Sequence, residues 1–244
     1  MPRSLYPPVA ALCYAIFLAT FLYLVGFVAD LAVLPRTVDR GPSAPLALTI
    51  VVDIGLIALF GLQHSTMARP AFKRAWTRIV AAPLERSVYV FAASVMLMIL
   101  FVGWRPIPTT VWVVEGPAAI LLWAGFLAGW AIVLLSTFLI NHFELFGLQQ
   151  AWLGWRERAA AAPRFRTPFL YRLVRHPLYS GFFLAFWSTP RMSVGHLLLA
   201  VGMSAYMLIA IRYEERDLTD TFGEDYRAYV GRVGMLLPGV GRRR

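Results

Sequence analysis

Long apolar blocks interrupt this sequence at regular intervals and limit what it can fold into. They run over about 8–34, 45–66, 86–104, 117–140 and 194–212, and a helix needs about twenty residues to cross ~30 Å of hydrocarbon. The blocks are continuous rather than alternating at every second residue, which argues against a spanning β-barrel. Only 15% of the residues are charged, against about 25% in soluble domains. The sequence therefore predicts an all-α, polytopic transmembrane helical bundle.

A shorter apolar segment at 178–190 precedes the last long block. As a helix it would be only ~18 Å long, so we expect it either to enter the membrane partway and turn at Thr189-Pro190, or to tilt against its partner helix. The prediction is thus five full crossings plus a short hairpin limb. Beyond Arg212 the polarity rises, and a C-terminal amphipathic helix is expected at the cytoplasmic surface. Its apolar face is carried by Leu218, Phe222, Tyr226 and Tyr229.

Basic residues set the expected orientation. Of the 23 lysines and arginines, all but Arg36, Arg40, Arg105 and Arg191 fall on the side that holds both termini. Cytoplasmic loops carry this excess, so the N- and C-termini are predicted to be cytoplasmic. The same bias explains the net charge of +10 without nucleic acid, and basic segments also attract membrane lipids. Nothing in the sequence fixes an oligomeric state.

Polar and ionisable residues gather at the predicted cytoplasmic helix ends. Such groups are costly there unless they pair or face water, so they indicate a functional site. A structural explanation stays open, because arginine snorkels to the interface and polar side chains cap helix ends. The candidates are His64, Arg69, Arg86, Asn141, His142, Arg175, His176, Tyr179, Tyr206, Arg212, Glu214 and Glu215. The hairpin should bring Arg175 and His176 beside the two glutamates.

Three C-terminal motifs resemble the signature of isoprenylcysteine carboxyl methyltransferases and phospholipid methyltransferases. They are Arg175-His176-Pro177-x-Tyr179-x-Gly181, Glu214-Glu215 and Phe222-Gly223-x-x-Tyr226-x-x-Tyr229. Further motifs extend the resemblance over nearly the whole chain, to bacterial methanethiol S-methyltransferases and their denitrification-associated relatives. These are Gln63-His64-Ser65-x-x-Ala68-Arg69-Pro70, Glu85-Arg86-Ser87-x-Tyr89-Val90 and Asn141-His142-Phe143-Glu144.

The resemblance implies that S-adenosylmethionine methylates methanethiol, giving dimethyl sulfide and S-adenosylhomocysteine. Residues 1–244 would form one integral membrane domain in the bacterial inner membrane, with the thiol side in 1–140 and the donor site in 165–232. In that donor site Arg175 and His176 would hold the donor carboxylate, and Tyr179 and Gly181 would shape the wall. One of Glu214 and Glu215 would bind the ammonium or ribose hydroxyls, while the other pairs with Arg212, Arg216 or Arg86. No metal is required, because the donor carries its own leaving group.

The thiol must lose its proton, since thiols are mostly protonated at neutral pH. Histidine is the natural base, and His64 and His142 are both candidates, with Tyr206 and Asn141 as orienting groups. Arg69 or Arg86 could instead lower the thiol pKa by proximity.

Two other functions stay open. The acceptor could be an isoprenylated cysteine carboxylate or a lipid amine. The chain could also be a non-enzymatic, haem-handling membrane protein, with His64 and His142 as axial ligands. Outside the cluster, Asp53 and His196 are expected to be structural.

Overall fold

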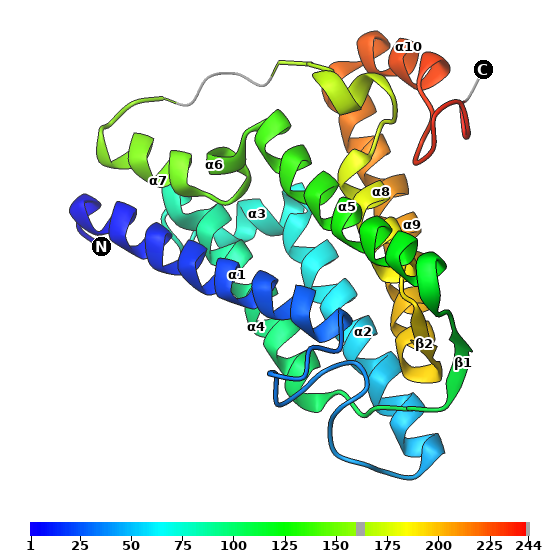
Figure 1. The fold of residues 1–244 in the computed structure, drawn as a ribbon. Coiled ribbons are helices and arrows are strands. Elements are labelled where there is room, and N and C mark those ends of the chain that lie inside the picture. The colour runs from blue at the N-terminus through cyan, green and yellow to red at the C-terminus, as the bar shows by residue number, and fades with distance from the viewer. Residues whose placement is uncertain (160–163, 243–244) are drawn as a thin grey trace. The chain divides into compact units, whose positions relative to one another are not determined.

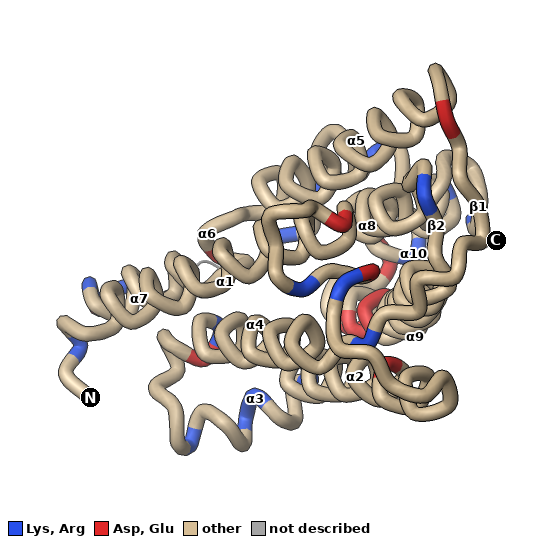
Figure 2. The backbone as a smooth tube through the Cα atoms, turned by 60° about the horizontal axis from the view of Figure 1, so that its bottom comes forward, with Lys and Arg blue, Asp and Glu red and all other residues tan. Residues whose placement is uncertain are grey.

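The computed structural model describes residues 1–159 and 164–242. Five helices are long and apolar enough to cross a membrane: α1 (Tyr6–Val28), α2 (Leu46–Ala68), α4 (Glu85–Gly103), α5 (Gly116–Ile140) and α9 (Val194–Phe222) (Figure 1). The prediction of an all-α bundle with five crossings is confirmed. Figure 2 shows α1 and α5 as tan tubes, because neither contains a charged residue.

Shorter elements lie before and between the long helices. The α-helices among them are α3 (Pro70–Trp76), α6 (His142–Leu145), α7 (Leu148–Trp155) and α8 (Pro177–Trp187). Helix α8, with 11 residues, is the predicted short limb. The 3-10 helices are Arg3–Leu5, Ala82–Leu84 and Phe169–Arg172. Strands β1 (Thr110–Val113) and β2 (Arg191–Ser193) form a two-stranded sheet.

Two helix ends differ from the sequence prediction. Helix α1 ends at Val28 instead of near 34, and Asp30 just beyond it adopts a φ of 50° that a helix does not allow. Helix α9 does not stop at 212 but continues to Phe222. Gly223, with a φ of 56°, then separates it from α10 (Glu224–Arg232). The expected amphipathic helix is therefore divided between the end of α9 and α10.

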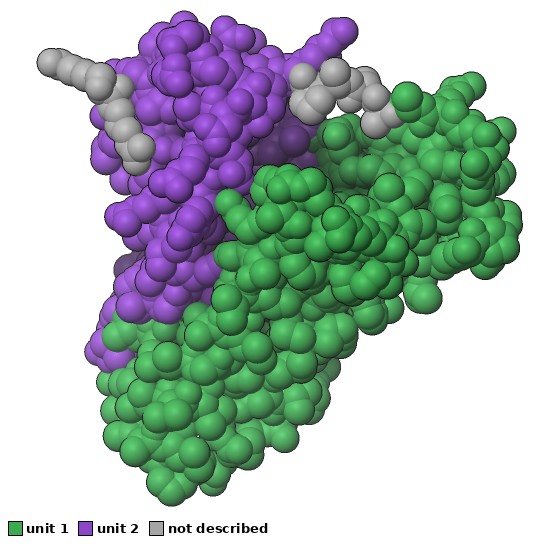
Figure 3. Space-filling model, turned by 180° about the vertical axis from the view of Figure 1, so that it is seen from behind, with its two compact units in different colours: residues 1–110, 141–161, 193–199 green, residues 111–140, 162–192, 200–244 purple. Residues whose placement is uncertain are grey.

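The chain forms two compact units, which Figure 3 colours separately. Unit 1 comprises residues 1–110, 141–161 and 193–199; unit 2 comprises residues 111–140, 162–192 and 200–244.

In unit 1, α4 packs against both α1 and α2, and α7 packs on α1. Part of the unit 1 core is aromatic: the rings of Phe17 and Phe146 are stacked, with their centres 4.2 Å apart. Asp53, buried in α2, accepts a hydrogen bond from the Arg105 backbone N–H at 3.0 Å, which supports its expected structural role. The buried His196 donates its backbone N–H to Ser193 Oγ at 3.0 Å near the start of α9.

In unit 2, α5 and α8 pack closely through small residues. A Cβ on Gly129 would lie 2.6 Å from the Ala185 nitrogen, and one on Gly181 would lie 2.8 Å from the Val133 nitrogen. Such contacts between backbones are typical of small residues at membrane helix interfaces. The pair holds the short α8 in place, and with it the charged residues just before α8.

Candidate functional site

A charged cluster in unit 2 joins the start of α8 to the C-terminal third of α9. The carboxylate of Glu215 accepts from Arg175 Nε at 2.7 Å and lies 3.2 Å from His176 Nε2. His176 Nδ1 lies 3.9 Å from Glu214 Oε1. The prediction that the hairpin brings these four residues together is confirmed.

The two glutamates differ in exposure. The side chains of Arg175 and Glu215 are 0% and 6% exposed, whereas that of Glu214 is 45% exposed. Buried charges need a partner, and Arg175 and Glu215 provide this for each other. Glu214 is therefore the more accessible of the two carboxylates.

The partner of Glu215 differs from the sequence prediction. We expected the second glutamate to pair with Arg212, Arg216 or Arg86, but Glu215 pairs with Arg175. Glu215 is buried while Arg212 and Arg216 are exposed, so its side chain lies on the face of α9 that meets the start of α8.

A C-terminal loop, residues 233–241, binds the start of α8 through its backbone. Arg175 Nη1 donates to the carbonyls of Val233 at 2.6 Å and Gly241 at 3.2 Å. The Arg175 N–H donates to the Gly234 carbonyl at 2.8 Å and the His176 N–H to that of Met235 at 3.1 Å. This loop therefore fixes the position of both Arg175 and His176.

The C-terminal loop was not predicted as part of the site. Its Gly234, Pro238, Gly239 and Gly241 indicate only a turn. A turn composition does not reveal which helix the loop will contact.

Tyrosines complete the surroundings of the cluster. Tyr229 donates its hydroxyl to the Tyr171 carbonyl. Burial, and then the charge of Glu214, raise the pKa of Tyr171, and burial raises the pKa of Tyr229 to about 12. Both phenols therefore remain neutral hydrogen-bonding groups at physiological pH.

Three other predicted residues of unit 2 have different surroundings. The Tyr179 ring centre lies 5.7 Å from that of His176, so Tyr179 belongs to the cluster. Gly181 faces α5, and helix packing explains its lack of a side chain. Tyr206 is partly buried on α9.

In unit 1, His64 and His142 each meet a tyrosine. Tyr89 Oη lies 2.7 Å from His64 Nε2, and Tyr14 Oη lies 2.8 Å from His142 Nε2. The guanidinium of Arg86 lies 5.0 Å from the Tyr89 ring centre. We refer to these as the two His–Tyr pairs.

Both His–Tyr pairs border one aromatic cluster. Phe146 packs in the same buried cluster as Tyr89, and its ring centre lies 4.8 Å from that of His142 and 5.8 Å from that of Tyr14. Burial lowers the pKa of His142. The imidazole is therefore neutral at physiological pH and can accept a proton.

Asn141 and Arg69 hold helix ends. Asn141 caps α6 by accepting from the Glu144 N–H at 3.3 Å, and it donates to Gln149 Oε1 at 2.6 Å. Arg69 Nε donates to the Ser65 carbonyl at 3.3 Å at the end of α2.

Tyr14 was missed as a candidate site residue, and Tyr89 was noted within a motif but given no role. A tyrosine in a membrane span must find a partner for its buried hydroxyl, and that was the available signal. Its partner, however, depends on which helices pack together.

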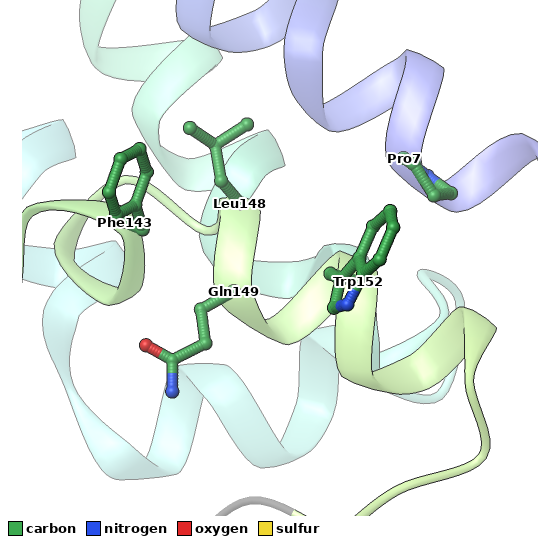
Figure 4. A pocket seen from close by; sticks show the side chains of 5 residues that line it. All are labelled: Pro7, Phe143, Leu148, Gln149 and Trp152. Atoms are coloured by element: carbon green, nitrogen blue, oxygen red, sulfur yellow. The ribbon is translucent and has the colours of Figure 1, made fainter.

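A pocket of about 440 Å³ opens beside α7 in unit 1 (Figure 4). It is lined by Pro7, Phe143, Leu148, Gln149 and Trp152. Within residues 1–159 and 164–242, no three His, Cys, Asp or Glu side chains are grouped to hold a metal ion.

Comparison with known proteins gives close sequence relatives. The chain is 50% identical over 239 residues to the methanethiol S-methyltransferase of Mycobacterium tuberculosis, covering 98% of each chain. It is 52% identical to that of a Pseudomonas species, covering 93% of this chain and 87% of the relative. It is 50% identical to methanethiol S-methyltransferase 1 of Bradyrhizobium diazoefficiens, covering 92% and 79%. No family model and no solved structure matches.

Proposed function

The chain belongs to the methanethiol S-methyltransferase family, and on that premise we propose that it transfers a methyl group from S-adenosylmethionine to methanethiol. The products are dimethyl sulfide and S-adenosylhomocysteine. The observation that carries the proposal is similarity over 98% of the chain to a relative named for this reaction. Those names favour a small thiol over an isoprenylated cysteine, a lipid amine or haem.

The charged cluster of unit 2 fits such a donor. S-adenosylmethionine carries an ammonium, a carboxylate and ribose hydroxyls. Glu214 offers a half-exposed carboxylate beside His176, suited to the ammonium or the hydroxyls. Arg175 Nη2 is buried with no hydrogen-bond partner among the described residues, so it retains donor capacity for a carboxylate.

Within this site, Glu215 and the C-terminal loop act as positioning groups. Glu215 holds Arg175 and His176 through its carboxylate, and the loop holds the same two residues through its carbonyls. Tyr179 adds a ring beside His176, and Gly181 contributes indirectly by seating α8 on α5. When bound, the donor supplies a methyl group on a sulfonium, which is its own leaving group.

The unit 1 histidines are suited to removing the thiol proton. The thiol S–H bond breaks and its proton passes to a neutral imidazole. The sulfur electron pair forms the new bond to the methyl carbon as the methyl–sulfonium bond breaks, and its electron pair leaves with S-adenosylhomocysteine. His142 and His64 are both candidates, each oriented by a tyrosine. Asn141 and Arg69 support this site from the ends of α6 and α2, and Arg86 lies near enough to the Tyr89 ring to favour an anion there. Tyr206 remains a candidate orienting group on α9 of unit 2.

The five apolar helices indicate an integral membrane protein. We place it in the bacterial inner membrane with both termini in the cytoplasm, on the distribution of lysine and arginine. The donor would then be supplied from the cytosol, and the apolar surroundings would exclude water from the attacking sulfur.

Headspace gas chromatography of membranes containing the chain tests the proposal. Membranes supplied with methanethiol and S-adenosylmethionine should release dimethyl sulfide. Glu214→Gln should raise the KM for the donor, while His64→Gln or His142→Gln should lower kcat, according to which histidine is the base. Glu224→Gln, in an exposed pair with Arg227, is the matched control. Absence of dimethyl sulfide from the wild-type membranes would refute the function.

A further inference from the structure

An open pocket lies beside α7, next to the residues proposed for the thiol: its Gln149 accepts from Asn141 at 2.6 Å, and the ring centre of its Phe143 lies 5.7 Å from that of His142. The pocket itself has no role in the proposed methyl transfer. Four of its five lining residues are apolar or aromatic, and Figure 4 shows Trp152 on α7 and Pro7 on α1. Its volume of about 440 Å³ lies within the range of small-molecule sites. Phe143 and Trp152 are nevertheless 57% and 49% exposed. The pocket therefore leaves large aromatic surfaces open.

Its position along the chain places the pocket at the edge of the membrane. The candidate span that contains α1 begins at Arg3, so Pro7 lies near the N-terminal end of that span. Residues at the end of a span lie at the level of lipid head groups and upper chain carbons. Tryptophan is enriched at this depth because its ring is apolar and its N–H is polar. Trp152 and Trp155 on α7 fit that pattern.

A positive charge lies next to the pocket. The Arg156 guanidinium lies 5.1 Å from the ring centre of Trp152, which lines the pocket, and 4.4 Å from that of Trp155. Arg158 follows and is exposed. Arg3 forms an ion pair with Glu157, so Arg156 and Arg158 leave this end of α7 positive.

We propose that this pocket binds an anionic phospholipid, with an acyl chain against Phe143 and Trp152 and the phosphate on Arg156. A guanidinium binds phosphate through paired N–H groups. A short helix with tryptophan and arginine side chains is typical of segments that lie at the lipid interface. The positive charge of Arg156 and Arg158 favours an anionic lipid over a zwitterionic one. The pocket holds the acyl chain of that lipid.

Fluorescence quenching by brominated lipids tests the proposal on the full chain. The protein is reconstituted in phosphatidylcholine nanodiscs that contain a minor fraction of phosphatidylglycerol, with bromine on the chains of one lipid at a time. Brominated phosphatidylglycerol should quench more strongly than brominated phosphatidylcholine at the same fraction. Trp152→Phe should reduce this difference, and Trp152→Phe with Trp155→Phe should remove it, because both rings lie beside Arg156. Arg156→Gln should raise the phosphatidylglycerol fraction needed for half of the effect by about threefold to tenfold, since one charge-assisted contact is lost.

Two matched controls should leave the preference unchanged. They are Trp123→Phe, a partly exposed tryptophan on α5, and Arg227→Gln, an exposed arginine on α10. Equal quenching by both lipids, or an unchanged preference in Arg156→Gln, would overturn the proposal. So would protection of Trp152 from both lipids together with a dimer in native mass spectrometry, which would assign the pocket to a second copy of the chain.

Discussion

The polar cluster of unit 2 and the His–Tyr pairs of unit 1 are held in different ways. In unit 2 a buried ion pair is fixed by side chains and by the carbonyls of a C-terminal loop. In unit 1 each histidine contacts a tyrosine hydroxyl and lies against aromatic rings. In the proposed reaction, a charged donor calls for fixed charges, whereas a thiol calls for a neutral base. The two clusters should therefore respond differently to mutation.

Loss of Glu215 should have the largest effect. Glu215→Ala leaves the Arg175 guanidinium buried without its carboxylate, and breaking a buried pair costs about 3–5 kcal/mol. We expect donor binding to be lost and the unfolding midpoint, followed by tryptophan fluorescence in detergent, to fall sharply. Glu214→Ala, at a half-exposed position, should weaken donor binding with little change in stability. Equal destabilisation by both variants would remove the distinction between the two glutamates.

Opening the C-terminal loop should have the next largest effect. A Cβ on Gly234 would lie 2.7 Å from the Gly239 nitrogen and 3.0 Å from that of Val240. Overpacking of this kind costs about 1–3 kcal/mol, so Gly234→Ala should raise the donor KM more than the thiol KM. Gly231→Ala on the exposed face of α10 is the control and should be neutral or stabilising. Parallel losses for donor and thiol would speak against a positioning role for the loop.

The His–Tyr pairs should be less costly to disturb. Tyr14→Phe removes the hydrogen bond to His142, worth about 0.5–1.5 kcal/mol. The single cysteine, Cys13, is buried on α1, so thermal labelling of its thiol reports unfolding of unit 1. The midpoint should fall by a few degrees, with donor affinity unchanged. A change in donor affinity of the size seen for Glu214→Ala would contradict the separation of roles.

A fall to mildly acidic pH should have the smallest effect on the stability of the folded protein. The pKa of His142 is lowered in the folded chain, while an exposed histidine titrates near ~6.5. The unfolded chain therefore takes up the proton first, and stability is lost as the pH falls below about 6.5. His142→Gln should flatten this slope when Cys13 labelling is compared at neutral and mildly acidic pH. An unchanged slope would show that His142 does not carry this pH dependence.

Sequence patterns predicted the five crossings, the short limb and the meeting of Arg175 and His176 with the two glutamates. Block length and charge distribution are local properties, and helix hydrogen bonds are satisfied within each segment. The end of α9 was predicted ten residues too early, because rising polarity alone does not end a helix, and residues 212–222 contain no proline or glycine that would.

What the sequence alone determined is that the chain crosses a membrane and carries the charged motifs of a methyltransferase. Tertiary structure decided that Glu215 is buried against Arg175 while Glu214 is half exposed, that Gly181 serves the contact with α5, and that Tyr14 and Tyr89 contact the histidines. The physical reason is that adjacent residues on a helix point about 100° apart. Which of them is buried, and against what, depends on the neighbouring elements.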